Sequence, residues 1–246
     1  SGVMLVTGGS RGIGAALCRL AAARGYDLCV NYAGNREAAE AVVAEVEAAG
    51  RKAVAVQADV SRPEEIPALF DAAAALGPLT ALVNNAGITG KISRLDAVDI
   101  EIIRRTVDLN VTGAILAARE AVLRMSTAQG GKGGGIVNIS SVAAKLGSPG
   151  EYTWYAATKG AIDSFTLGLA KEVAQEGIRV NAVSPGLIET EIHAAGGNPD
   201  RIAQTAPNIP MGRAGTPEEI AQAVLWLLSE QASYITGAVL GASGGR

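Results

Sequence analysis

Residues 3–14 read VMLVTGGSRGIG, in which an apolar run passes directly into a turn that contains four glycines. The first part, Val3–Thr7, predicts a buried strand, and the pattern that follows predicts a helix over Arg11–Arg24. Glycines allow a tight turn and a close approach of the backbone, and the helix N-terminus offers free N–H groups and the positive end of its dipole. The stretch therefore predicts a pyrophosphate site, with contacts expected from Gly8, Ser10, Arg11, Gly12, Ile13 and Gly14.

The same alternation of apolar runs and helical patterns continues along the chain. The predicted strands are apolar throughout, which indicates burial on both faces, as in a parallel sheet covered by helices. The predicted strands are Val3–Thr7, Leu28–Tyr32, Ala53–Gln57, Leu79–Asn84, Ile136–Ser140, Arg179–Val183 and Ala238–Gly241. The predicted helices are Arg11–Arg24, Glu37–Ala49, Pro63–Leu76, Asp99–Met125, Tyr152–Glu176 and Pro217–Ser229.

Repeated strand–helix–strand units with right-handed crossovers give a doubly wound sheet. We therefore predict an α/β fold in which residues 1–246 form a single Rossmann-type domain, with a seven-stranded parallel sheet and helices on both faces. Three local expectations accompany this fold. Ser61 caps the helix that begins at Pro63, the run Gly130–Gly135 forms a flexible surface loop, and Asp27 precedes the second strand and faces water.

Composition excludes several classes of protein. The hydrophobic content is 48% and the net charge is -3, with no long basic run, so the chain is globular and nucleic acid is not an expected partner. No apolar run approaches the roughly 18 residues of a membrane span, and no signal peptide is recognised, so we expect a cytoplasmic protein. Cys18 and Cys29 lie in apolar stretches and are expected to be buried and reduced. One histidine and two separated cysteines form no metal-ligand cluster, so no metal is expected.

The end of the second predicted strand bears on the choice of dinucleotide. NAD-preferring sites place an acidic residue here to bind the ribose 2′-hydroxyl, whereas this chain has Asn31, Tyr32 and Ala33. Because no carboxylate would repel a 2′-phosphate, NADP(H) is favoured and NAD(H) is the second choice. Arg11 or Arg36 could pair with the phosphate, although Arg36 could equally be a solvated residue of the first helical turn. Asn31 and Tyr32 are included among the expected cofactor contacts.

Polar residues follow the third and fourth predicted strands. Asp59 and Val60 follow the third strand, and Asn84-Asn85-Ala86-Gly87 ends the fourth. In open parallel sheets, ligands bind at the carboxyl ends of the strands. The alternatives are a helix cap for Asp59 and a simple turn for the asparagine pair.

Tyr155 and Lys159 lie four residues apart on a predicted helix and therefore on one face, about 6 Å apart along the axis. Such a pair alone is common on exposed helix faces, but here Ser141 ends the fifth strand just upstream, at the ligand-binding edge. A free tyrosine has a pKa of about 10, too high for a base at neutral pH. A nearby ammonium and an oxidised nicotinamide would both lower the pKa of Tyr155.

These motifs, in this order and with this spacing, resemble the short-chain dehydrogenase/reductases over essentially the whole chain. The resemblance implies that Tyr155 is the general acid or base and that Lys159 binds the nicotinamide ribose and lowers the pKa of Tyr155. It implies that Ser141, rather than Ser140, hydrogen-bonds the substrate oxygen. Asn110 matches the asparagine that anchors a relay water near the lysine, with a packed residue in a helix kink as the alternative.

The resemblance also assigns cofactor contacts and a lid. The implied contacts are Asp59, Val60, Asn85, Ala86, Gly87, Tyr155, Lys159, Pro185, Gly186, Ile188 and Thr190. Residues 191–213 would form a mobile lid over the substrate, and His193 within it would lie on the lid surface or touch the substrate. A homotetramer is implied as well, with Trp226 and Leu227 either in that contact or in the core.

The resulting function is hydride transfer between nicotinamide and a small-molecule carbonyl or alcohol. A sugar-nucleotide epimerase or dehydratase would usually be longer, and a nucleotide-sensing protein without turnover would not need both Tyr155 and Lys159. The segment Leu146–Tyr152 resembles that of glucose-dehydrogenase-like members, and acyl-carrier-protein ketone reductases are also near relatives. Lys91, Arg94, Arg104 and Arg105 could recognise an acidic carrier or be plain solvated charges. A small carbonyl or sugar-like substrate is preferred.

Overall fold

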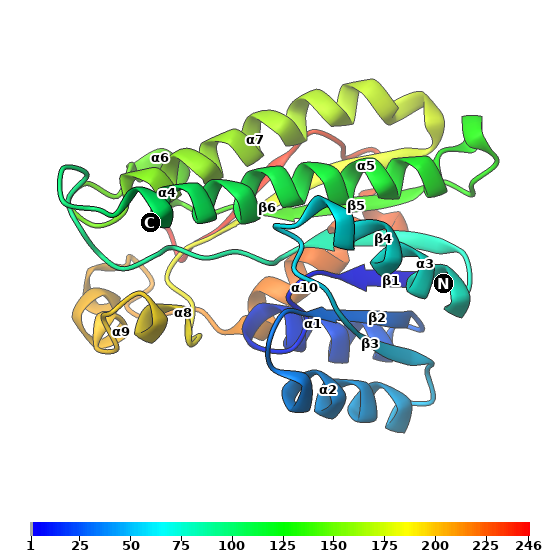
Figure 1. The fold of residues 1–246 in the computed structure, drawn as a ribbon, viewed down its shortest axis with the longest axis horizontal. Helices are drawn as coiled ribbons and strands as arrows, with labels where there is room; N and C mark the ends of the chain where they lie inside the picture. Colours follow the sequence, from blue (N-terminus) through cyan, green and yellow to red (C-terminus); the bar gives the residue numbers. More distant parts are fainter. Residues whose placement is uncertain (1) are drawn as a thin grey trace.

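The computed structural model describes residues 2–246, apart from the side chain of His193, so the expectation for that side chain lies outside the description. The strands form one seven-stranded parallel sheet in the order β3-β2-β1-β4-β5-β6-β7, which confirms the predicted fold class (Figure 1). The strands are β1 Val3–Val6, β2 Asp27–Tyr32, β3 Ala53–Gln57, β4 Leu79–Asn84, β5 Gly134–Ile139, β6 Ile178–Pro185 and β7 Val239–Ala242.

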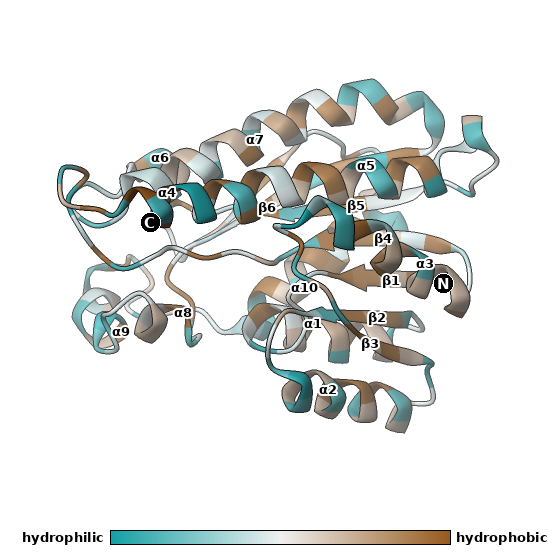
Figure 2. Ribbon diagram, viewed as in Figure 1, coloured by the Kyte–Doolittle hydropathy of each residue, from teal (hydrophilic) through white to brown (hydrophobic). Residues whose placement is uncertain are grey.

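Helices cover both faces of the sheet, and each face has its own apolar cluster. Met4 and Val6 of β1 pack into one cluster and Val3 and Leu5 into the other, because successive side chains of a strand point to opposite faces. The first cluster includes residues of α1 Gly12–Ala23, α2 Arg36–Ala48 and α10 Pro217–Leu228. The second includes residues of α3 Ile66–Leu76, α5 Ala114–Met125 and α7 Thr153–Val173. Strands β1 and β4, at the centre of the sheet, are accordingly hydrophobic along most of their length, whereas the helices are mixed (Figure 2).

The predicted helix Asp99–Met125 is not regular. It consists of α4 Ile100–Val107, a π-helical segment Asp108–Gly113, and α5, with Asp99 as the N-cap whose side chain accepts from the Glu101 N–H. Gly113 closely approaches the connection that follows β3, because a Cβ at this position would lie 2.4 Å from the Val60 carbonyl oxygen. The widened turn lets the helix pass this contact and bury Asn110 on its inner side.

The glycine run after α5 is only partly the surface loop that we expected: Gly130 is exposed, whereas the second half of the run is packed. Gly134 and Gly135 begin β5. A Cβ on Gly133 would lie 2.5 Å from the Gly177 carbonyl oxygen, and one on Gly134 would lie 2.3 Å from the Thr80 carbonyl oxygen. These glycines are therefore present because three backbones meet at this point, and they enter the sheet as a packed segment.

Two further local expectations are wrong. Asp27 is the first residue of β2 and does not face water, because its carboxylate accepts from the Lys52 N–H at 2.9 Å and pairs with Arg51 at 2.8 Å. Ser61 does not cap α3, since its hydroxyl donates to the Asp59 carboxylate at 2.6 Å. The chain enters α3 through a short 3₁₀ turn, Pro63–Glu65.

Residues 191–213, called the 191–213 segment below, contain the short helices α8 Ile192–Ala195 and α9 Arg201–Thr205. Figure 1 shows these helices beside the sheet edge, apart from the helices that cover the two faces. Leu187, Ile209 and Ala214 form a small apolar cluster of their own, with Ile202 packed against it. Another short helix, α6 Ala143–Leu146, lies between β5 and α7. In the part of the chain described, no helix combines the length and apolar character of a membrane span.

Candidate active site

The turn after β1 is held in a shape that requires glycine. Gly8 has φ +62° and Gly12 has φ +51°, a region that side-chain-bearing residues rarely adopt. A Cβ on Gly14 would lie 2.4 Å from the Gly8 carbonyl oxygen and 2.7 Å from Asn85 Nδ2. Arg11, the N-cap of α1, makes no side-chain capping bond, so the first-turn N–H groups are available at this end of the helix. The turn thus has the shape and donors that a phosphate needs.

Asn85 ties the turn to the end of β4. Its side-chain amide donates to the carbonyl oxygens of Thr7 at 3.0 Å and Gly8 at 2.9 Å. In return, the Thr7 hydroxyl accepts from the backbone N–H groups of Asn85 at 3.0 Å and Ala86 at 3.1 Å. These four bonds lock the ends of β1 and β4 together. The sequence pointed to Asn85 and Ala86 as ligand contacts but did not reveal the part played by Thr7.

Asn31 and Tyr32 lie at the expected strand end, but both residues are only 2% exposed. Asn31 Oδ1 accepts from the Gly8 N–H at 3.1 Å, and its Nδ2 donates to the Ala58 carbonyl oxygen at 2.9 Å. Both side chains are therefore directed into the protein, where that of Asn31 supports the turn. Ala33 is the first exposed residue after β2.

A hollow of about 380 Å³ opens beyond this strand end. It is lined by Ala33, Gln57, Asp59, Arg62 and Glu65. Asp59 was expected at such a site, and the hydrogen bonds from Ser61 help to hold the pKa of its carboxyl below the usual value against the effect of burial. Sequence patterns carried no signal for Gln57 or Glu65, because a pattern of single polar residues does not show which of them share a surface.

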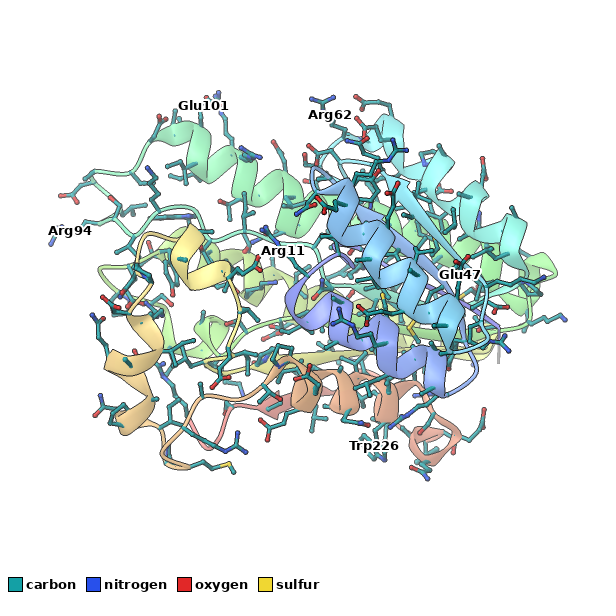
Figure 3. All side chains as sticks on the ribbon, turned by 90° about the horizontal axis from the view of Figure 1, so that it is seen from below. Arg11, Glu47, Arg62, Arg94, Glu101 and Trp226 are labelled. Atoms are coloured by element: carbon teal, nitrogen blue, oxygen red, sulfur yellow. The ribbon has the colours of Figure 1, made fainter. Side chains whose placement is uncertain are left out.

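The two arginines considered for the 2′-phosphate differ in their surroundings. The Arg36 side chain pairs with Glu40 at 3.1 Å, one turn along α2. Arg11 lies between the start of α1 and α8, where it meets Glu191 at 3.5 Å, and both side chains of this pair are about 70% exposed (Figure 3). Arg11 is thus the arginine that lies at the glycine turn itself.

Ser141, Tyr155 and Lys159 come together at the same sheet edge. The Ser141 hydroxyl lies close enough to the Tyr155 phenol to lower its pKa, and Ser141 Oγ accepts from the Ala143 N–H at 3.1 Å. Lys159 Nζ lies 5.6 Å from the centre of the Tyr155 ring and donates to the Ile139 carbonyl oxygen at 2.7 Å. Ser140 is buried and lies against the Lys159 backbone instead. The structure thus brings Ser141, and not Ser140, to the tyrosine.

Asn110 is held beside this group by the π-helical segment. Its Oδ1 accepts from the Ile88 N–H at 2.9 Å, and its Nδ2 donates to the Ile88 carbonyl oxygen at 2.9 Å and to the Thr158 hydroxyl at 3.1 Å. A Cβ on Gly87 would meet Asn110 Oδ1 at 3.2 Å and Lys159 Nζ at 3.7 Å. Asn110, Gly87 and Lys159 are therefore immediate neighbours, and the alternative of a packed residue in a helix kink also describes Asn110.

Burial dominates the protonation of the two central groups. It raises the pKa of Tyr155 to about 12, against the opposing effect of the nearby Ser141 hydroxyl. It lowers the pKa of Lys159 to about 8, against the opposing effect of Asp163. We expected Lys159 and a nicotinamide cation to lower the pKa of Tyr155. In the protein alone the direction is reversed, because desolvation of the phenolate outweighs the positive charge nearby.

The stretch after β6 closes the site from the other side. Pro185 ends β6, and a Cβ on Gly186 would lie 2.8 Å from Ser243 Cα. Ile188 forms a parallel bridge with Gly215. Thr190 faces the glycine turn, since its Cγ2 lies 3.3 Å from the Cβ position of Gly12. The loop is thus in reach of a ligand bound at the turn.

A doubly wound parallel sheet with an open glycine turn after β1, and a serine, tyrosine and lysine at the same edge, defines a dinucleotide-dependent oxidoreductase. The chain belongs to the short-chain dehydrogenase/reductases. Residues 8–246 match a family model described as enoyl-(acyl carrier protein) reductase.

Relatives of known sequence or structure match along nearly their full length. The chain is 52% identical over 245 residues to the uncharacterized oxidoreductase YgfF of Escherichia coli, covering 99% of each. A short-chain dehydrogenase/reductase of Serratia marcescens, solved as a double mutant, is 35% identical with a TM-score of 0.91, covering 100% of this chain and 97% of the other. A blue fluorescent protein from a metagenomic library, solved in complex with NADPH, is 37% identical with a TM-score of 0.91 and the same coverage.

Proposed function

We propose that the protein transfers a hydride between NADP(H) and a carbonyl or secondary alcohol, with Tyr155 as the group that gives or takes the proton. The observation that carries this proposal is the meeting of Tyr155, Ser141 and Lys159 at the carboxyl edge of the sheet, beside the glycine turn. When bound, the dinucleotide supplies or accepts the hydride.

Four side chains would transfer the proton and orient the reacting groups. Tyr155, with a pKa of about 12, is protonated at neutral pH and ready to donate to a carbonyl oxygen. The Ser141 hydroxyl, already directed at the tyrosine, hydrogen-bonds the same oxygen and orients it. Lys159, with a pKa of about 8, is mainly protonated at pH 7 but can lose its proton at little cost, so it can help to reprotonate Tyr155. Asn110 holds the backbone next to Lys159 in place.

The cofactor fits the residues at the other end of the edge. Phosphate oxygens would be held by the N–H groups of Gly12, Ile13 and Gly14 at the glycine turn, and Asp59, Val60, Ala86 and Gly87 would surround the adenosine. We favour NADP(H) because the exposed residue after β2 is Ala33 and the arginine at the turn is Arg11. The NADPH complex of the metagenomic relative supports the same choice.

A fluorescence titration tests the cofactor choice. NADPH should bind at least roughly tenfold more tightly than NADH, and Ala33→Asp should narrow or reverse this ratio by placing a carboxylate near the 2′-phosphate. Ala75→Asp, an exposed alanine on α3, is the matched control and should leave the ratio unchanged. Equal affinities in the unmodified protein would argue against the 2′-phosphate site.

The reaction itself is tested with a panel of ketones, aldehydes, sugars and acyl thioesters, followed by NADPH absorbance. We propose a small carbonyl or sugar-like molecule as the substrate. Tyr155→Phe should reduce turnover by about 10²–10⁴-fold, because the proton donor is lost, and should leave NADPH affinity nearly intact. A Tyr155→Phe variant with normal rates would refute the assigned role.

We also propose a homotetramer. Exposed apolar side chains lie on the outer helices, and Trp226 projects from α10 (Figure 3). They include Ile100, Val107, Ile115, Leu123 and Leu167 on α4, α5 and α7. Burial of such side chains against other copies would remove them from water.

A further inference from the structure

The 191–213 segment carries a buried arginine that reaches the start of α7. Arg201, the first residue of α9, is only 8% exposed. Its Nη1 and Nη2 donate to the two carboxylate oxygens of Glu151 at 2.7 and 2.8 Å. This two-pronged geometry is the strongest form of an arginine–carboxylate pair. It links the segment to the turn that leads into the helix bearing Tyr155.

The same guanidinium lies over an aromatic ring. Arg201 Cζ is 5.3 Å from the centre of the Tyr152 ring, within cation–π range. The Tyr152 ring in turn meets the Tyr155 ring edge-on, with centres 5.4 Å apart and an interplanar angle of 88°. Arg201, Tyr152 and Tyr155 thus form a contiguous row from the segment to the reactive phenol.

The other polar attachments of the segment to the body are weaker or more exposed. The Met211 N–H donates to the Gly244 carbonyl oxygen at 3.1 Å, and Arg213 pairs with Glu219 where both side chains are half exposed. Glu191 and Arg11 are 3.5 Å apart and largely exposed, and exposed ion pairs contribute little. The Gly196 carbonyl oxygen accepts from the Ile92 N–H at 3.1 Å. The apolar cluster of Leu187, Ile209 and Ala214 packs near the base of the segment. Breaking the buried Arg201–Glu151 pair should therefore release the segment more than breaking any one of the other polar attachments.

We propose that Arg201 is a positioning residue of the reaction. It latches the 191–213 segment to the start of α7 through Glu151 and holds Tyr152, and through it Tyr155, in the orientation that meets Ser141. This inference rests on the proposed role of Tyr155 as the acid–base group.

Arg201 is also the charged group that reaches Tyr155 from outside α7 and its entry turn. The titratable or charged groups facing the two tyrosines are Lys159 on α7, Glu151 in the entry turn, Arg201 on α9 and Arg246 at the C-terminus. The charge of Arg201 lowers the pKa of Tyr155, against the larger effect of burial. Closure of the segment would therefore bring a cation toward Tyr155, and opening would take it away.

Three variants separate the effect of the Arg201–Glu151 pair on the segment from the effect of the Arg201 charge on Tyr155. Arg201→Gln removes both the pair and the charge. Arg201→Lys keeps the charge but loses the two-pronged hydrogen bonds, and Glu151→Gln weakens the pair by removing the charge of the carboxylate. Arg213→Gln is the matched control, because Arg213 and Glu219 form a similar two-pronged pair at 2.8 and 2.6 Å that is half exposed and lies at the end of the segment.

The first measurement is limited digestion by thermolysin, which reports opening of the segment without any substrate. Arg201→Gln and Glu151→Gln should raise the rate of cleavage within residues 191–213 by roughly tenfold or more, and Arg213→Gln should leave it within about twofold. The double variant Arg201→Gln/Glu151→Gln should be no worse than the single ones, because both remove one interaction. Cleavage of Arg201→Gln at the wild-type rate would overturn the latch.

The second measurement is the pH dependence of alcohol oxidation. The alcohol used is the reduction product of a panel substrate that the protein oxidises fastest. In Arg201→Gln the rise in rate with pH should move to higher pH, because the phenolate loses a nearby cation, whereas Arg201→Lys should retain the wild-type profile at a lower rate. An Arg201→Gln profile that is slower but unshifted would overturn the connection to Tyr155. If the wild-type protein oxidises and reduces nothing in the panel, the proposed function fails, while the digestion result still decides the latch.

Discussion

The glycine turn and the 191–213 segment face the same sheet edge but are held in opposite ways. The turn is fixed by backbone contacts that leave no room for a Cβ on Gly14 and by four hydrogen bonds between Thr7, Gly8, Asn85 and Ala86. The segment is held by a small apolar cluster and a few polar attachments, of which the Arg201–Glu151 pair is buried. This difference is what the proposed function requires, because a rigid turn would preform the cofactor site and an adjustable segment would cover the substrate.

The largest expected effect comes from a substitution in the glycine turn, the more rigid of these two regions. Gly14→Ala places a Cβ 2.4 Å from the Gly8 carbonyl oxygen, so the turn or α1 must move. We expect a loss of about 2 kcal/mol or more in the free energy of unfolding, together with a loss of NADPH binding, measured by denaturation and by fluorescence titration.

Gly168→Ala on α7 is the matched control, because nothing lies within 4 Å of its Cβ position. It should be neutral or more stable by about 0.5–1 kcal/mol, since alanine favours a helix. If Gly14→Ala bound NADPH normally, the turn would not be the rigid element described above.

A second test concerns the pKa of Lys159, which is buried beside the glycine turn, in contrast to that of Arg201, which is paired with Glu151 in the segment. Burial lowers the pKa of Lys159 to about 8 from 10.5, whereas the Glu151 hydrogen bonds raise the pKa of Arg201. Between about pH 8 and 10.5, the unfolded chain therefore binds more protons at Lys159 than the folded protein does. The Lys159 contribution to stability should therefore rise with pH in this window by an amount on the order of 3 kcal/mol, and the full penalty remains below pH 8. The buried thiols of Cys18 and Cys29, whose pKa burial raises from 9.0 to about 12, act in the opposite direction above about pH 9, so the Lys159 contribution is the difference between the wild-type protein and a Lys159 variant.

Lys159→Met should abolish this rise, as measured by urea unfolding at pH 7 and pH 10. Lys171→Met, with its side chain on the exposed face of the same helix, serves as the control and should keep the wild-type rise. An equal pH dependence in Lys159→Met and the wild-type protein would assign the change to other groups.

The smallest effect on global stability is expected from a substitution in the 191–213 segment. Ile209→Ala removes a 3% exposed side chain from the small apolar cluster of the segment. Because that cluster is separate from the two large cores, opening of the segment should become easier while the global unfolding midpoint changes little. Thermolysin digestion should be several-fold faster, and the substrate KM should rise more than kcat falls. A large drop in global stability would show that the segment and the cores unfold together.

The fold and the edge of the sheet were predictable because they depend on local patterns. Apolar runs marked the strands, and the glycine turn, Asn85, Ser141, Tyr155 and Lys159 each follow a strand or share a helix face. The inward orientation of Asn31 was not predictable, because a strand buried on both faces has no polar alternation that shows where a side chain points.

Contacts between residues distant in the sequence were also hidden. The run Gly130–Gly135 looked like a loop because its partners, Gly177 and Thr80, are far away along the chain. Arg201 and Glu151 are separated by 50 positions, and no periodicity connects them. The pKa of Tyr155 was expected to fall, because the charges were visible in the sequence while the cost of desolvation depends on the packed structure.

The π-helical segment Asp108–Gly113 restricts how this gene can change in length. A residue in a regular helix advances by about 100° around the axis, so the extra residue of a widened turn sets the rotational phase between α4 and α5. Deleting one codon here would restore a uniform spiral but rotate Asn110 away from Ile88, or else turn the apolar side of α5 off the sheet. An insertion or deletion within these six positions would therefore disturb either the site or the packing of α5.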